Sequence, residues 1–278
     1  MMQQTARGFI VGGFTDHHVH LQLVDHALLA DSVLGRVIDL GGNPAVLADM
    51  QAGVEIAYAG AFLTPPGGYP SMRSWAPEGS VREIPDADAA ARAVAEMKES
   101  GAVCIKVASN RIAGSVFSDE MLQRIIELAA QESLPVIAHA EGRGEAQRVA
   151  ALGVDLLAHA PFSERLTDDE ISLQAASVQW ISTLAIHAGP TYETAVDNVR
   201  RFHAAGGGTV LYGTDMGNGP TSVDLSEREI RALREAGIDG DALIRTLAPV
   251  DDGRQLFIPG DVPDPLLARP LTPADLEE

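Results

Sequence analysis

Four of the eight histidines in this chain stand at the ends of short apolar runs, where a metal-binding side chain can be held in place. His18 and His20 lie two residues apart in the segment TDHHVH, and an extended chain places such residues on the same face. His139 follows the run LPVIA, and His159 follows the run VDLLA. Imidazoles placed in this way can share metal ions, whereas a single isolated pair could equally be structural.

Two further residues extend this pattern. Asp215 ends the segment TVLYGTD and supplies a carboxylate, and imidazole together with carboxylate suits zinc or a similar divalent ion. Lys106 lies in the apolar segment AVCIKVA and is one of only two lysines in the chain. A buried ammonium costs several kcal/mol unless it is neutralised, paired or modified, so Lys106 indicates either a special role or an ion pair at a rim.

These residues need elements to position them, and the chain alternates short apolar runs with stretches of helical spacing. Alternating strands and helices predict parallel pairing, and eight such units predict an α/β fold of the (β/α)8 TIM-barrel type. A doubly wound open sheet is the competing layout. In a barrel, catalytic residues belong at the C-terminal ends of the strands, where the residues above lie. The predicted strands are near 14–20, 36–39, 54–62, 102–107, 135–139, 154–158, 179–184 and 208–213.

The composition excludes several classes of protein. The chain has 278 residues and a net charge of −19, which disfavours nucleic acid and anionic membrane surfaces as partners. With 46% hydrophobic residues it can bury a large core, and no apolar run is long enough to span a membrane. The N-terminus lacks a signal-peptide pattern, and the single cysteine, Cys104, cannot form an internal disulfide. We therefore expect a soluble, cytoplasmic protein.

The order of these residues resembles the amidohydrolase superfamily of metal-dependent hydrolases: H-x-H on the first strand, Lys on the fourth, His on the fifth and sixth, and Asp on the eighth. Local segments are similar to its imidazolonepropionase-like and Xaa-Pro dipeptidase (prolidase) branch. The resemblance covers roughly residues 12 to 248. The segments that carry it are VIDLGG, TPPGGYP, HAEGRGEAQRVAALGVDLLAHAPFSERLTDDEI, WISTLAI and NVRRFHAAGGGTVLYGTD.

The resemblance implies a binuclear centre with two divalent ions, zinc being the expected metal. It implies that Lys106 is carboxylated and that this carbamate bridges the ions. Such ions lower the pKa of water from about 15.7 toward about 7 and polarise a carbonyl. Asp215 would take the proton from the attacking water and pass it to the leaving group. The implied ligands are His18, His20 and Asp215 for one ion, His139 and His159 for the other, and Lys106 between them.

Two further residues are candidates for substrate binding. Tyr69 stands where this branch commonly has a histidine after the paired glycines, and His187 lies just beyond the seventh predicted strand. Arg73 and Trp75, on the loop after the third strand, are interpreted as surface packing. The remaining histidines, His17, His26 and His203, are interpreted as structural.

The resemblance also implies a domain organisation. We expect a single domain over residues 1–278, with a barrel core at about 12–248 and a tail at 249–278. Too few residues flank the barrel for the complete β-sandwich of most relatives, so it is absent or vestigial. The segment FIPGDVPDPLLA resembles the final motif of the family, which leads into its last strand. The missing sandwich would expose a barrel flank, which indicates a homo-oligomer.

The predicted function is hydrolysis of an amide bond in a small molecule, such as an N-acyl amino acid, an Xaa-Pro dipeptide or a cyclic amide. Lactone or ester hydrolysis at the same site is the first alternative. Mononuclear deamination or imidazolone-type ring opening is less consistent with Lys106. A degenerate ligand-binding barrel without turnover, and a scaffold protein, are the non-enzymatic alternatives.

Overall fold

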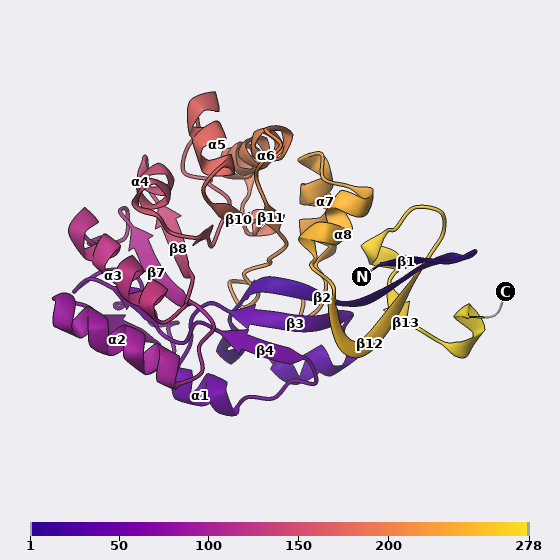
Figure 1. The fold of residues 1–278 in the computed structure, drawn as a ribbon, viewed down its shortest axis with the longest axis horizontal. Coiled ribbons are helices and arrows are strands. Elements are labelled where there is room, and N and C mark those ends of the chain that lie inside the picture. Colours follow the sequence, from indigo (N-terminus) through magenta and orange to yellow (C-terminus); the bar gives the residue numbers. More distant parts are fainter. Residues whose placement is uncertain (1, 277–278) are drawn as a thin grey trace.

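The computed structural model describes residues 2–276, and in it the strands form two sheets (Figure 1). The first sheet has the order β13-β12-β2-β3-β4, with β1 added beside β2. The second has the order β11-β10-β9-β8-β7-β5-β6 and is parallel throughout. The strands are β1 (Gln3–Gln4), β2 (Gly8–Val19), β3 (Leu34–Asp39), β4 (Glu55–Tyr58), β5 (Phe62–Thr64), β6 (Val81–Glu83), β7 (Ile105–Asn110), β8 (Val136–Glu141), β9 (Leu156–Leu157), β10 (Gln179–Ile181), β11 (Val210–Leu211), β12 (Val250–Pro259) and β13 (Arg269–Pro270).

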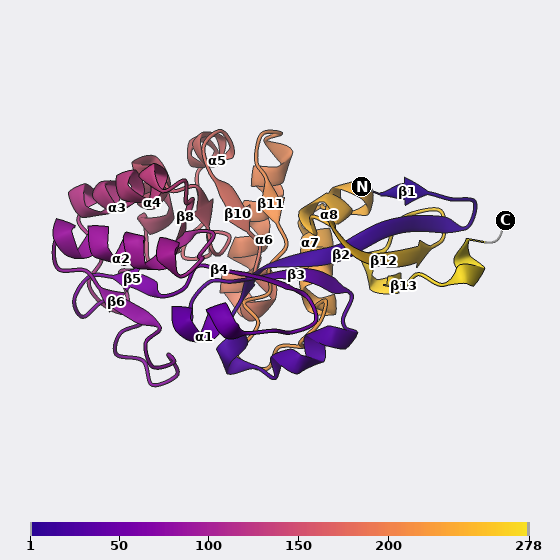
Figure 2. The same cartoon turned by 60° about the horizontal axis from the view of Figure 1, so that its bottom comes forward.

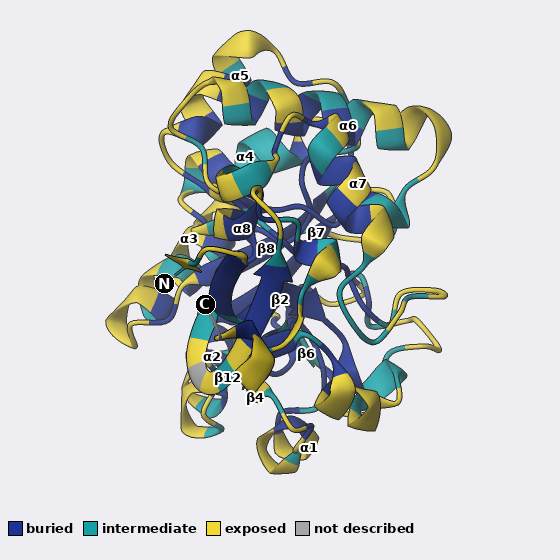
Figure 3. Ribbon diagram, turned by 90° about the vertical axis from the view of Figure 1, so that its right-hand side faces the viewer, coloured by how far each residue is buried: buried dark blue, intermediate teal, exposed yellow. Residues whose placement is uncertain are grey.

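Helices lie along the outer side of the parallel strands, whereas β1, β12 and β13 extend beyond them (Figures 1 and 3). In α3, for example, Leu122, Ile125 and Ala129 are buried at helical spacing, while the opposite face is exposed. This helix therefore buries one apolar stripe. The helices are α1 (Pro44–Asp49), α2 (Ala87–Glu99), α3 (Asp119–Gln131), α4 (Glu145–Leu152), α5 (Asp168–Ala175), α6 (Gly189–Ala204), α7 (Glu227–Glu235) and α8 (Gly240–Thr246).

The α/β class with parallel pairing is confirmed, but the closed eight-stranded barrel is not: no single closed sheet forms within residues 2–276. The predicted strand at 54–62 is interrupted between β4 and β5, because Gly60 takes the left-handed conformation with φ of 75°. The first sheet also meets the second between β2 and the segment around β11, where individual contacts join them. His17 N–H donates to the Tyr212 carbonyl at 3.0 Å, and Val19 forms an isolated parallel bridge with Met216.

The two ends of the described chain meet in an antiparallel ribbon beside β2. The strand β12 pairs with β2 in a register that runs from Val250 opposite Gly13 to Pro259 opposite Gly8. Figure 2 shows this ribbon of β1, β12 and β13 extending beyond the helices on one side. The apolar residues of FIPGDVPDPLLA that follow Pro-Gly form a short 3-10 helix, Pro265–Leu267, and not the strand expected there.

The tail folds back on the ribbon. Arg269 forms an ion pair with the buried carboxylate of Asp275, and the Arg7 guanidinium donates to the Ala274 carbonyl at 2.7 Å.

A capping box at the start of α5 illustrates how local sequence fixes these helices. Thr167 Oγ1 accepts a hydrogen bond from the Glu170 amide, while the Glu170 carboxylate accepts one from the Thr167 amide. Replacing Thr167 by Ala is expected to lower the free energy of unfolding by about 1 kcal/mol, measured by urea denaturation. Thr167→Ser keeps the hydroxyl and serves as the control. An equal loss in both variants would contradict the capping role.

Candidate functional site

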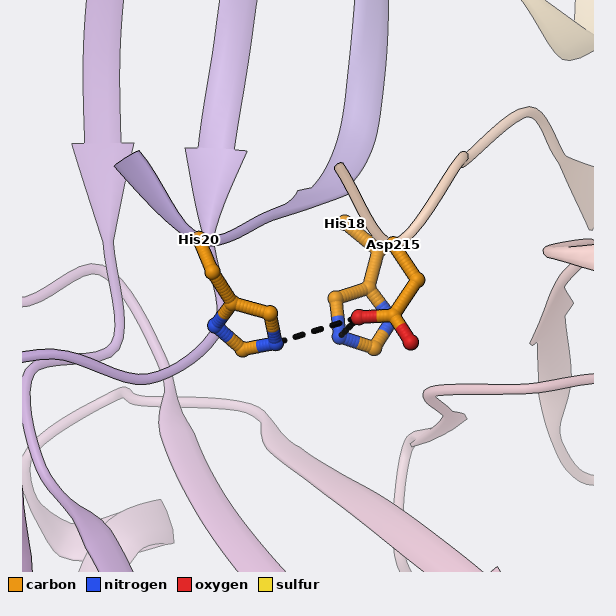
Figure 4. Close-up of side chains that lie close together, drawn as sticks. All are labelled: His18, His20 and Asp215. Carbon is orange, nitrogen blue, oxygen red and sulfur yellow. Dashed lines mark ion pairs between the residues drawn. The ribbon is translucent and has the colours of Figure 1, made fainter. Parts of the chain in front are cut away.

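His18, His20 and Asp215 form a buried cluster where the two sheets meet (Figure 4). Asp215 Oδ1 lies 3.3 Å from His18 Nε2 and 3.1 Å from His20 Nε2. One ligand atom from each residue lies within 4.8 Å of the others. Within the described part of the chain, this is the one group of three or more His, Cys, Asp or Glu residues that meets this spacing. The distances suit a shared divalent ion.

The two imidazoles are oriented by hydrogen bonds on their far sides. His18 Nδ1 lies 2.8 Å from the Ala158 carbonyl, and His20 Nδ1 lies 3.0 Å from the Gly41 carbonyl. A carbonyl oxygen only accepts, so both Nδ1 atoms are donors, and the Nε2 atom of each ring faces Asp215 and is the atom that would bind a metal ion. This is the arrangement in which metal-binding histidines are usually held, so the donor set fits a metal ion.

Asp215 has an ionised carboxylate in a buried, conformationally unusual position. Burial alone would raise the pKa of Asp215, but the imidazoles of His18 and His20 outweigh it and hold the pKa well below its usual value. Its φ is 54°, a left-handed conformation that is uncommon outside glycine and frequent at functional sites. Asn218 donates a hydrogen bond to Oδ2 at 2.7 Å. The carboxylate is therefore fixed with Oδ1 toward the imidazoles.

Lys106 lies directly beside this cluster. Its side chain is buried within β7, and Nζ is 3.5 Å from His18 Nε2. Burial lowers the pKa of Lys106 to about 8, although the nearby carboxylate of Asp215 opposes this shift. Lys106 is 1% exposed, so it does not reach a rim, as one structural interpretation of this residue would require.

His139 and His159 complete a group of four neighbouring imidazoles. The centroid of the His159 ring lies 4.7 Å from that of His18 and 4.9 Å from that of His139. His159 Nδ1 is 2.9 Å from the hydroxyl oxygen of Thr183, whose φ of 43° is also left-handed. The structure thus brings all six predicted ligands into one site. Only His18, His20 and Asp215 lie at common ligand distance.

A single cavity of about 950 Å³ contains all the residues predicted for the site. Tyr69 stacks on His139 with ring centroids 5.2 Å apart, and the guanidinium of Arg73 lies 5.7 Å from the Tyr69 ring. Trp75 lines the cavity beside Tyr69, so it contributes to the site as well as to surface packing. The remaining lining residues include Leu23, Phe62, Ile112, Glu141, Arg143, Phe162, Ser163, Ile186 and Thr191.

His187 enters the cavity from the segment after β10. Its ring packs against Phe162 at a centroid distance of 4.3 Å, and its buried Nε2 has no hydrogen-bond partner among residues 2–276. Burial lowers the pKa of His187 to about 4, so the ring is neutral at pH 7. A neutral imidazole with a free nitrogen can donate to or accept from a ligand. His17, in contrast, turns away, and its Nδ1 lies 2.9 Å from the Tyr212 carbonyl.

Two buried carboxylates that hold the segments of this site in place were not predicted from the sequence. Asp16 Oδ1 accepts hydrogen bonds from the amides of His18 and Thr214, and Asp16 Oδ2 accepts one from the Thr214 hydroxyl at 2.6 Å. Asp16 therefore ties the H-x-H segment of β2 to the segment that carries Asp215. Its signal in the sequence was its position two residues before His18.

A second buried carboxylate acts on the other histidine of the motif. Asp39 accepts hydrogen bonds from the amides of Leu21 and Gly41, at 2.7 and 2.9 Å. The carbonyl of Gly41 in turn accepts the hydrogen bond that orients His20. Asp39 thus holds the turn on which the position of the His20 ring depends.

Glu141 and Asn110 were also missed. Glu141 ends β8 two residues after His139, and its Oε2 lies 3.3 Å from His139 Nε2. Asn110 ends β7, and its amide nitrogen donates to Glu141 Oε2 at 2.5 Å. The spacing H-x-E was visible in the sequence, since residues two apart at the end of a strand share a face.

Comparisons of the whole chain place this fold among known structures. No family model and no curated protein sequence matches the chain. A Xaa-Pro dipeptidase structure with bound methionine aligns with a TM-score of 0.71 at 18% identity, covering 91% of this chain and 81% of the other. An A. niger ochratoxinase structure aligns with a TM-score of 0.69 at 16% identity, covering 91% of this chain and 77% of the other. A phenylurea hydrolase B structure aligns with a TM-score of 0.64 at 15% identity, covering 91% of this chain and 80% of the other.

These alignments define the class of fold. The α/β fold of this chain is shared by solved structures described as a Xaa-Pro dipeptidase, an ochratoxinase and an amidohydrolase, in agreement with the family resemblance of the sequence. No helix among the described residues is long and apolar enough to cross a membrane.

Proposed function

We propose that the protein is a metal-dependent hydrolase of the amidohydrolase superfamily that cleaves an amide bond of a small molecule. The observation that carries this proposal is the buried cluster of His18, His20 and Asp215, with both Nε2 atoms facing the carboxylate, on the wall of a large cavity. Solved structures of the same fold that are described as a dipeptidase and as an amidohydrolase support the class of reaction.

We assign two divalent ions, zinc by expectation, to this site. His18, His20 and Asp215 would hold one ion, and His139 and His159 the other, with a carbamate on Lys106 between them. The position of Lys106 Nζ beside His18, and the ring contacts of His159 with both His18 and His139, support this assignment. When bound, the ions supply Lewis-acid polarisation of the substrate carbonyl and a lowered pKa for water.

The side chains of the chain itself perform the remaining steps. Asp215 accepts a proton from the attacking water and returns it to the leaving nitrogen. Asn218 holds Oδ2 of that carboxylate through a single hydrogen bond, so a second lone pair on Oδ2 stays available for the proton. His187 and Tyr69 line the cavity and contact the substrate, and the neutral ring of His187 offers a hydrogen bond.

Elemental analysis of protein purified without chelators tests this function, with wild type compared with Lys106→Ala. We expect about two ions per chain in the wild type and one or none in the variant, as for a lysine-bridged pair. The control is Lys98→Ala, since the other lysine of the chain is exposed on α2 and donates to the Glu132 carbonyl. A thermal melt checks that each variant folds.

The other outcomes have distinct meanings. One ion in both wild type and Lys106→Ala would assign Lys106 to structure and indicate a mononuclear site. Absence of metal from the wild type, combined with no turnover of amides or lactones, would refute the hydrolase and favour a ligand-binding protein.

A further inference from the structure

Glu141 places a carboxylate in the cavity that the proposed hydrolysis does not use. It ends β8 two residues after His139, and its side chain is 28% exposed, with the exposed part lining the cavity. Neither a proton transfer nor a predicted ligand position has been assigned to it. A charged group held in such a place is a candidate for recognition of the substrate.

One oxygen of this carboxylate is fixed by its neighbours. Oε2 accepts a hydrogen bond from the Asn110 amide at 2.5 Å and lies 3.3 Å from His139 Nε2. Asn110 is itself immobilised, because its Oδ1 accepts from the amides of Ile112 and Ala113 at 3.0 and 2.9 Å. Within residues 2–276, no side chain or amide donates to the other oxygen, Oε1. The carboxylate is therefore oriented but not saturated with hydrogen bonds.

The ion-pair partner of Glu141 among the described residues is the imidazole of His139. Among the described residues, no Lys or Arg forms an ion pair with it, and the remaining charged groups of the cavity are otherwise engaged. Asp215 belongs to the ligand cluster of His18, His20 and Asp215, and Lys106 lies beside it with Nζ 3.5 Å from His18 Nε2. Arg143 lies at the rim with its side chain 91% exposed, and its Nε is 3.2 Å from a Glu164 oxygen. Glu141 thus lines the cavity without a Lys or Arg partner among residues 2–276.

Aromatic side chains provide the rest of the cavity wall. Phe62 and Trp75 meet edge to face at a centroid distance of 6.3 Å, and Tyr69 adjoins Trp75 at 6.0 Å. Phe162 also lines the cavity and packs against the ring of His187. An apolar group can be buried against these rings, while a cation is attracted to Glu141.

We infer that Glu141 binds the free α-amino group of the substrate, so that the preferred substrates are aminoacyl amides with an apolar side chain. This inference rests on the proposed amide hydrolysis. The α-nitrogen is two bonds from the scissile carbonyl carbon, so a substrate whose carbonyl lies at the ligand cluster brings its ammonium group close to a carboxylate beside His139. Glu141 then forms a charge-assisted hydrogen bond through its free oxygen.

Paired substrates test this recognition in the metal-loaded enzyme. Phe-Pro and L-phenylalanine 4-nitroanilide are compared with their N-acetyl derivatives, in wild type and in Glu141→Gln. We expect the wild type to prefer the free amines by about 10- to 100-fold in kcat/KM, the range for a hydrogen bond to a charged group. Glu141→Gln should lose most of this preference, mainly through a higher KM for the free amines, whereas Glu141→Asp should retain part of it. Glu127→Gln, which removes an exposed carboxylate from α3, is the matched control.

A binding measurement separates this inference from the proposed function. L-Phenylalaninol carries the amine but no scissile carbonyl, and its affinity is measured by calorimetry against that of N-acetyl-L-phenylalaninol. Wild type should bind the free amine at least about 10-fold more tightly than Glu141→Gln does. If no amide is hydrolysed but this difference is found, the proposed function fails and the recognition stands.

Three outcomes would overturn the role of Glu141. The first is equal turnover of free and acetylated substrates by the wild type, which leaves amide hydrolysis intact. The second is an unchanged preference and affinity in Glu141→Gln. The third is a loss of metal from Glu141→Gln relative to the wild type, because the residue would then act through the ions and not on the substrate.

Discussion

Replacing Asp215 by Asn is expected to lower kcat by about 10³-fold, within the range for loss of a general base, while the protein keeps at least one metal ion. Asparagine retains an oxygen at this position and can still be a ligand, but a neutral amide cannot accept the proton of the attacking water. The pKa of Asp215 lies well below its usual value, so the wild-type carboxylate is ionised across the working pH range. Initial rates with saturating amide substrate and metal analysis of the same sample measure both effects.

The control for this substitution removes a carboxylate elsewhere. Asp88→Asn changes an exposed residue in the first turn of α2 and should leave kcat and metal content unaltered. A rate for Asp215→Asn equal to that of the wild type would assign the proton transfer to another group. A complete loss of metal would show that Asp215 acts first as a ligand, and the rate would then carry no information on its role as a base.

The predicted ligand residues could be located from sequence because they follow apolar runs that must be buried. The runs before His139 and His159 end at β8 and just beyond β9, and parallel neighbouring strands bring their C-terminal ends to one edge. The roles of Glu141 and Asn110 could not be assigned in this way. Their contact depends on the register that places Asn110 opposite Glu141, and strand register is set by pairing between distant segments.

The division of the strands into two sheets, in place of one closed barrel, was the feature of the fold that was hardest to predict from the sequence. Short strands such as β9 and β11 have only two residues each, so their pairing depends on neighbours and not on their own propensity. The left-handed Gly60 divides one predicted strand in two, and a Cβ atom at that position would lie 2.5 Å from the sulfur of Met97. A glycine within an apolar run signals such a break, but the run alone does not show it.

The ribbon of β12 was missed for a related reason. The segment VDDGRQLFIP mixes charged residues and Gly253 with its apolar half, so it lacks the alternation of a typical strand. Its partner is β2, more than 200 residues earlier in the chain, where Leu256 pairs with Val11 and Phe257 with Ile10. Only this long-range pairing makes it a strand.

Removal of the metal should cost the protein all turnover and much of its thermal stability. A ligand that binds only the folded state stabilises it by about 2.7 kcal/mol at a concentration 100 times its Kd. For a chain of this size that shift corresponds to about 5 °C in Tm. The ligand atoms of His18, His20 and Asp215 are close together only in the folded chain, because β2 and the segment after β11 must meet to form the cluster.

The adjacent histidines of the segment DHHVH provide the sharpest version of this experiment. Thermal melts are recorded with chelator and with excess zinc for His18→Ala and His17→Ala. The His17 ring contacts the Tyr212 carbonyl and not the cluster, so His17→Ala should retain the full zinc-dependent rise in Tm even if its metal-free Tm is lower. His18→Ala removes the imidazole whose Nε2 lies 3.3 Å from Asp215, and it should lose most of that rise. Equal zinc responses in the two variants would place the metal elsewhere in the protein, since these neighbouring residues differ in the direction of their rings far more than in burial.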